Sequence, residues 1–184
     1  MDKYRLPKSV MIEDCEVPID TDFRNILKIF EILNDPDLLT EERVLISLDW
    51  FYDSDDYCKD IELATKEMFS FICMDDIENQ KPSNSKPVYD WEADFDIIVA
   101  PVNKILGTDV RGLEYLHWWT FLSAFMEIGE STFNTFVGIR TKLNKGVKLE
   151  KYEEKILKEN RDKIILKPKV DSVTQQLMDE IMGV

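Results

Sequence analysis

The sequence has few of the residues on which most catalytic and cofactor sites depend. It contains 1 His, 3 Cys and 6 Gly in 184 residues. The single histidine, His117, excludes a histidine-rich zinc site, and the cysteine spacings match no metal or redox motif. Gly107 and Gly112 have the spacing of a phosphate-binding loop, but Leu113 and Glu114 occupy the positions of its Lys and Ser/Thr. We therefore expect no enzymatic activity, no cofactor and no metal.

The chain also lacks an uncharged apolar run long enough to span a bilayer, and its first residues form no signal-peptide core. We therefore expect it to stay in the cytoplasm where it is made. Basic residues are outnumbered, with 23 Lys and Arg against 37 Asp and Glu, and the net charge is −14. This balance argues against binding to nucleic acid or anionic membranes, both of which require positive charge. It favours solubility and cationic partners.

Apolar side chains are abundant, and their spacing is helical. Hydrophobic residues make up 44% of the chain, with 10 Phe, 6 Tyr and 4 Trp, which is sufficient for a core. Their periodicity predicts an all-α fold, a helical bundle of about six to eight helices with an extended N-terminal arm and a C-terminal amphipathic helix. The six helices expected in the core cover residues 22–33, 41–52, 59–74, 90–106, 110–126 and 132–141.

Three regions are expected along the chain. Residues 1–19 form an arm with a short strand at 10–12. Residues 20–145 form a helical core domain with a flexible linker at 75–88, where prolines and turn formers gather. Residues 146–184 hold an exposed charged helix at 149–166 and the amphipathic helix at 171–182.

Capping residues set the expected helix ends. Asp20 or Thr21 is expected to cap the first helix, Thr40 the second and Ser131 the sixth. Gly107 is expected to follow the fourth helix in a left-handed conformation. Pro101 is expected to kink that helix.

Several acidic motifs resemble metal or catalytic sites but are incomplete. Glu114 and His117 have the spacing of a di-metal motif, which requires a second copy. Asp53–Asp56 begins like a calcium loop, yet Cys58 and Ala64 replace its glycine and its bidentate glutamate. The acids between Asp90 and Asp96 suit a helix N-terminus. A metal-dependent enzyme using Glu114, His117 and these acids remains an alternative.

Aromatic residues supply the candidate binding site. They are expected to fill the core or to form a groove for a protein partner, because Trp and Tyr are frequent in binding hot spots. A Met-containing edge of the C-terminal helix is a second candidate. The predicted partner-binding residues are Trp91, Phe95, Trp118, Trp119, Phe121, Phe125, Leu177, Met178 and Ile181.

Five segments in order resemble one protein family. They cover residues 23–30, 38–45, 89–98, 113–125 and 137–142, and the most specific are Glu-Tyr-Leu-His-Trp-Trp at 114–119 and Gly-Ile-Arg at 138–140. Over residues 20–145 the chain resembles the bacteriophage "gene product fifteen" family of long-tailed phages and prophages of Gram-positive bacteria.

The genes of that family lie between those of the major tail protein and the tape measure protein. The resemblance therefore implies a tail assembly chaperone that coats the tape measure protein in the host bacterial cytoplasm. It also implies self-association or binding to an upstream tail chaperone, and it supplies no catalytic residues. Two alternatives are a structural connector of the tail and an acidic inhibitor that mimics nucleic-acid charge.

Overall fold

The computed structural model describes residues 4–74 and 86–167, which divide into two compact units. Within these ranges, unit 1 comprises residues 4–74 and 115–120, and unit 2 comprises residues 86–114 and 121–167. The boundary between them falls inside helix α5 (Trp118–Met126).

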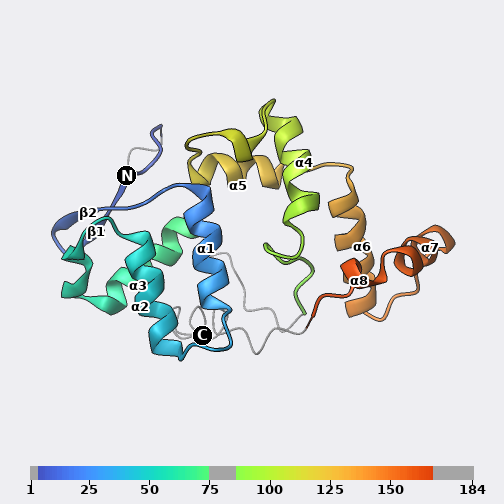
Figure 1. The fold of residues 1–184 in the computed structure, drawn as a ribbon, viewed down its shortest axis with the longest axis horizontal. Helices are drawn as coiled ribbons and strands as arrows, with labels where there is room; N and C mark the ends of the chain where they lie inside the picture. Colours follow the sequence, from blue (N-terminus) through green and yellow to red (C-terminus); the bar gives the residue numbers. More distant parts are fainter. Residues whose placement is uncertain (1–3, 75–85, 168–184) are drawn as a thin grey trace. The chain divides into compact units, whose positions relative to one another are not determined.

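Unit 1 combines a β-hairpin with three helices. Strands β1 (Ser9–Ile12) and β2 (Cys15–Pro18) pair antiparallel, so the expected strand at 10–12 is present. Helix α1 (Phe23–Leu33) packs against α2 (Thr40–Phe51), which packs against α3 (Ile61–Ile72), and a short 3-10 helix, η1 (Asp55–Lys59), precedes α3 (Figure 1).

Two expected caps in unit 1 are wrong. Asp22 caps α1 by accepting the Arg24 N–H, while Asp20 accepts the N–H of Asp22. Thr40 is the first helical residue of α2, and the Glu42 carboxylate closes that end by accepting the Leu39 N–H. At both helix starts, the backbone N–H groups are bound by the carboxylate that lies within hydrogen-bonding distance. This carboxylate does not belong to the residue that its capping preference alone favoured.

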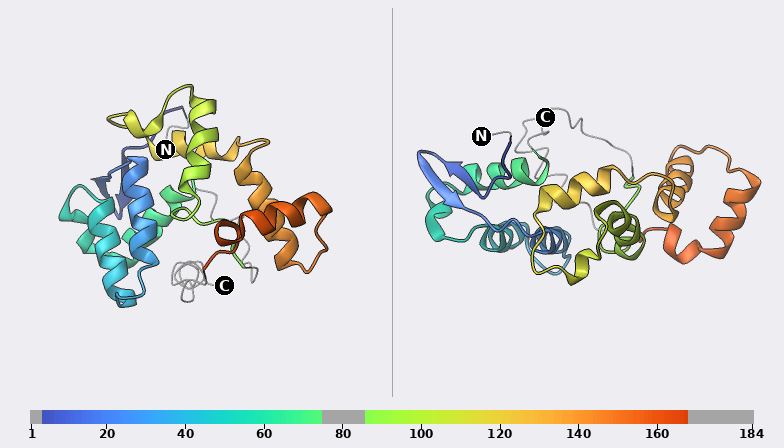
Figure 2. Two further views of the ribbon diagram at one scale, coloured as in Figure 1. Left: turned by 45° about the vertical axis from the view of Figure 1, so that its right-hand side comes forward. Right: turned by 90° about the horizontal axis from the view of Figure 1, so that it is seen from above.

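Unit 2 contains α4 (Phe95–Leu106), the 3-10 helix η3 (Val110–Gly112), the second part of α5, α6 (Thr132–Asn144), α7 (Lys151–Glu159) and α8 (Arg161–Ile164). Helix α6 contacts α4 and α8, and α8 contacts α7 (Figure 2). The expected Ser131 cap of α6 and the left-handed Gly107 after α4 are confirmed. Helix α4 runs through Pro101, and a kink there stays a prediction.

Three predicted helices have different limits. Helix α4 begins at Phe95, and the residues before it form a turn in which the Asp90 carboxylate accepts the Glu92 and Ala93 N–H groups. The tryptophan-rich helix begins at Trp118 instead of following Asp109, which caps η3. The expected helix at 149–166 is divided at Asn160, and Ile164 after this break is fully buried.

The all-α class is confirmed in broad terms, with eight α-helices and one small two-stranded sheet in the described ranges. No helix within these ranges is long and apolar enough to cross a bilayer. The predicted helix at 171–182 lies outside the described residues, as does most of the predicted linker.

Two glycines of unit 2 allow a matched test of backbone conformation. Gly107 has φ of +72°, whereas Gly138 lies inside α6 and a Cβ there meets no atom within 4 Å. We expect Gly107→Ala to lower the free energy of unfolding by about 1 kcal/mol. Gly138→Ala is expected to raise it by about 0.5–1 kcal/mol, since alanine favours a helix interior. Urea unfolding measures both, and effects of the same sign would contradict this assignment.

Candidate functional site

Two tryptophans of the predicted site close the end of a helix in unit 1. The Trp118 Nε1–H donates to the Ile72 carbonyl at 2.9 Å, and the Trp119 Nε1–H donates to the Phe71 carbonyl at 2.8 Å. These carbonyls belong to the last two residues of α3. The Phe71 carbonyl also accepts the Met74 N–H, and the Trp118 indole supplies a donor for the Ile72 carbonyl. Trp118 is 1% exposed. Both indoles therefore complete unit 1.

The segment before α5 is extended because its backbone pairs with the start of α1. The Trp118 N–H donates to the Thr21 carbonyl at 2.7 Å, and the Phe23 N–H donates to the Leu116 carbonyl at 3.0 Å. If these residues were helical, their backbone N–H and C=O groups would point along the helix axis and could not pair with the start of α1. Tertiary hydrogen bonds thus explain why α5 starts late.

The single histidine has a defined tautomer. The His117 Nε2–H donates to the Pro7 carbonyl at 2.9 Å, and Nδ1 accepts the Trp119 N–H at 3.0 Å. Both ring nitrogens are therefore engaged, and neither is offered to a metal. Burial lowers the pKa of His117, the Pro7 carbonyl opposes this, and the charge of Lys8 adds to the lowering. In the described ranges, no group of three or more His, Cys, Asp or Glu is placed to hold a metal ion.

A shallow depression lies beside this segment in unit 1. It has a volume of about 330 Å³. Its lining residues are Lys8, Ile19, Asp20, Thr21, Asp53 and Tyr115. The Asp20 carboxylate accepts hydrogen bonds from the Asp22 N–H and the Asn25 side chain, so it holds the start of α1.

Unit 2 carries a second group of aromatic rings, which we name the aromatic cluster: Tyr89, Trp91, Phe121, Phe125 and Phe133. The rings of Trp91 and Phe125 are 4.5 Å apart, and Tyr89 lies 5.5 Å from each of them. Phe121 and Phe133 are buried, Trp91 and Phe125 are half-buried, and Tyr89 is 36% exposed. The aromatic cluster therefore has a buried base and an accessible edge.

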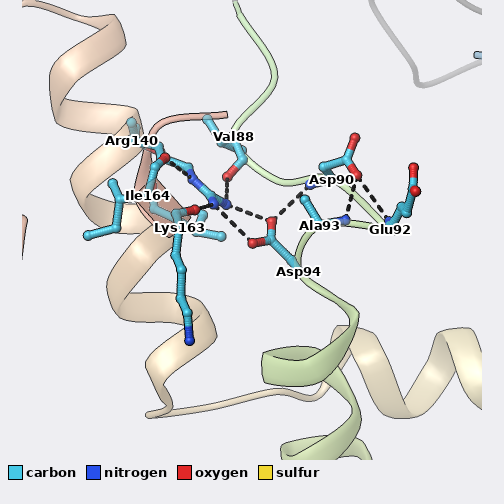
Figure 3. A network of polar contacts seen from close by, with 10 residues as sticks. Val88, Asp90, Glu92, Ala93, Asp94, Arg140, Lys163 and Ile164 are labelled. Carbon is cyan, nitrogen blue, oxygen red and sulfur yellow. Dashed lines mark hydrogen bonds and ion pairs between the residues drawn. The ribbon is translucent and has the colours of Figure 1, made fainter. Parts of the chain in front are cut away.

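A buried ion pair fixes the segment before α4, which carries the accessible edge of the aromatic cluster (Figure 3). The Arg140 guanidinium donates to both Asp94 carboxylate oxygens, at 2.6 and 2.9 Å. It also donates to the Val88, Lys163 and Ile164 carbonyls, and the Asp94 carboxylate accepts the Asp90 N–H. Because Tyr89 and Trp91 lie between these contacts, the ion pair positions both rings.

The acidic residues before α4 thus have a structural explanation. Asp94 pairs with Arg140, and Asp90 accepts the Glu92 and Ala93 N–H groups. Both carboxylates therefore stabilise the turn before α4 and its contact with α6. The described residues of this region are therefore arranged as hydrogen-bonded carboxylates beside a partly exposed group of aromatic rings.

The sequence comparison covers both units. A family model described as "Bacteriophage Gp15 protein" matches residues 3–166. The chain belongs to the bacteriophage Gp15 protein family. Searches of curated proteins and of solved structures give no match to this chain.

The predicted site residues of this Gp15 family member fall into separate groups. Trp91, Phe121 and Phe125 lie in the aromatic cluster, and Phe95 is half-buried in the first turn of α4. Trp118 and Trp119 belong to unit 1. Leu177, Met178 and Ile181 lie outside the described residues, so their role stays a prediction.

The sequence interpretation missed Tyr89 and Phe133, the remaining members of the aromatic cluster. Tyr89 is two residues from Trp91, and this spacing was an available signal. Phe133 is in the first turn of α6 and contacts the ring of Phe125 at 5.4 Å between centroids. That contact depends on the tertiary fold and has no counterpart in the local sequence.

His117 predicts a specific pH dependence. Its native pKa lies below the ordinary value of 6.5, so the unfolded state binds more protons as the pH falls through that region. The stability that neutral His117 contributes is therefore complete above pH 6.5 and decreases as the pH drops towards the native pKa. Urea unfolding between about pH 5 and pH 8 measures this, and His117→Gln is expected to flatten the slope. An unchanged slope in the variant would contradict the assignment.

The ion pair predicts a large stability effect. We expect Arg140→Met to lower the free energy of unfolding by about 3–5 kcal/mol, because it leaves the Asp94 carboxylate buried without its partner. The matched control is Arg111→Gln, which breaks a pair whose side chains are 56% and 51% exposed. Solvent screens that pair, so the control is expected to unfold close to the parent midpoint in urea. Equal losses in the two variants would refute the structural role of the buried pair.

Proposed function

We propose that this Gp15 family member is a non-enzymatic tail assembly chaperone that binds the phage tape measure protein in the host bacterial cytoplasm. Membership of a bacteriophage family supports a role in phage biology. The observation that carries the proposal is the accessible edge of the aromatic cluster, formed by Tyr89, Trp91 and Phe125.

The aromatic cluster has the composition of a binding hot spot. Aromatic rings supply a large contact area, and their few rotatable bonds limit the entropy lost on binding. The Arg140–Asp94 pair holds the Tyr89–Trp91 segment before any partner arrives. Pre-ordering of this kind improves affinity because less freedom is lost on association.

The negative charge near the aromatic cluster indicates which kind of partner segment would bind there. Exposed carboxylates stand close in sequence to the aromatic cluster, at Glu92, Glu127 and Glu130. An apolar segment flanked by Lys or Arg therefore complements this region better than an acidic one. A long partner that repeats such segments recruits many copies of the chaperone, and self-association strengthens the coat through avidity.

A structural connector of the tail is the second candidate function, since the same aromatic surface suits a permanent interface. The inhibitor alternative receives less support. A nucleic-acid mimic presents carboxylates free along one face, whereas several here are paired, including Asp22 with Arg24, Glu31 with Lys28 and Glu153 with Lys142.

The test is co-expression with the tape measure protein encoded beside this gene, followed by affinity capture and size-exclusion chromatography with light scattering. We expect a soluble complex with several copies of this protein per tape measure. We expect Trp91→Ser to weaken capture by about 30-fold, the effect of losing one hot-spot residue. The matched control is Tyr152→Ser, which removes a 61%-exposed ring of α7 from the same unit.

Two outcomes would count against this function, and a third would count against its proposed site. An insoluble tape measure protein beside a monomeric Gp15 protein would refute chaperone activity. Retention of the protein in purified, mature tails at fixed stoichiometry would favour the connector. Normal capture by Trp91→Ser, with its unfolding midpoint unchanged, would remove the aromatic cluster as the binding site.

A further inference from the structure

Helix α2 buries an arginine that has no partner in the described chain. Arg43 is 7% exposed, and its Nε is buried without a hydrogen bond. One turn later the Ser47 hydroxyl is fully buried and also has no partner among the described residues. Arg140, the other buried arginine of the described chain, makes five hydrogen bonds.

This difference calls for a ligand at Arg43. A guanidinium stays charged at all physiological pH values, so burial cannot be relieved by losing a proton. Buried polar groups in native proteins are nearly always hydrogen-bonded. A carboxylate suits the site because it accepts two hydrogen bonds from a guanidinium and a further one from a neighbouring hydroxyl.

The same side of α2 exposes apolar side chains. Residues at 39, 43, 46 and 50 are spaced by four, three and four, so they share one helical face. Leu39 is 70% exposed, Trp50 is 43% exposed and Ile46 is half-buried. We name Leu39, Arg43, Ile46 and Trp50, with Ser47 at their edge, the α2 face. It combines apolar surface with an unsatisfied positive charge.

We propose that the α2 face binds the C-terminal segment of the same chain, residues 171–184. These residues lie outside the described part, and their sequence is complementary to the face. Asp179 and Glu180 stand between Leu177, Met178, Ile181 and Met182, so carboxylates are flanked by apolar side chains. One of the two acids pairs with the Arg43 guanidinium, and the apolar residues cover Leu39, Ile46 and Trp50.

Tethering favours this occupant over a separate molecule. The protein has a net charge of −14, so a free acidic partner is repelled before it reaches Arg43. A segment of the same chain is held at high effective concentration and avoids that barrier. The contact uses unit 1 alone and is independent of tape measure binding by the aromatic cluster.

Hydrogen exchange of the full-length protein tests the proposal. A helix of about a dozen residues is marginal in water by itself, so amides in 171–184 exchange quickly unless the segment is docked. We expect them to be protected in the parent protein and to exchange at least about tenfold faster in Arg43→Gln. The matched control is Lys66→Gln, an exposed cation of α3, which is expected to leave the protection unchanged.

A second pair of variants keeps the test decisive if Arg43→Gln disturbs unit 1. Asp179→Asn with Glu180→Gln leaves every described residue intact and is expected to remove the same protection. The charge reversal Arg43→Glu is expected to be rescued by Asp179→Lys with Glu180→Lys. Fast exchange of 171–184 in the parent protein would overturn the proposal. So would unchanged protection in the acid variants, or protection that depends on protein concentration, which indicates a segment from a second copy.

Discussion

The need to give buried polar groups hydrogen-bond partners governs how both units of this chain are built. In unit 1 the indoles of Trp118 and Trp119 complete the last carbonyls of α3, and His117 joins the Pro7 carbonyl to the Trp119 amide. In unit 2 Arg140 binds one carboxylate and three carbonyls. An unpaired buried group costs more free energy than a typical hydrogen bond contributes, so these contacts determine which backbone paths are accessible.

The need for hydrogen-bond partners also explains which helices sequence periodicity predicted correctly and which it did not. Helix α1 and the Ser131 cap follow from local patterns, because apolar spacing and capping act within a few residues. The late start of α5 follows from the pairing of Trp118 with Thr21, almost a hundred positions away. In α2 the apolar Leu45 is 47% exposed, whereas the polar Arg43 and Ser47 are buried. A hydrophobicity pattern carries no information about such buried polar positions.

The candidate site shows a similar division. Composition identified Trp91, Phe121 and Phe125 as important aromatic residues, and the structure places them in one cluster with Tyr89 and Phe133. The sequence did not separate them from Trp118 and Trp119, whose indoles donate to carbonyls of α3 in unit 1. Aromatic content is a local property, whereas the choice between an interior role and an accessible edge depends on which backbone groups lie within reach.

The buried ion pair connects the stability of unit 2 to its proposed binding surface. Replacing such a pair by apolar residues is often neutral or stabilising, so Arg140 and Asp94 are not explained by stability alone. Their contacts with the Val88 carbonyl and the Asp90 amide hold the segment on which Tyr89 and Trp91 are presented. A purely apolar substitute would fill the same volume but would offer no donor to Val88 and no acceptor to Asp90. Directional hydrogen bonds are therefore needed to order the aromatic edge before a partner binds. In the proposed function, this is the role of the buried ion pair of unit 2.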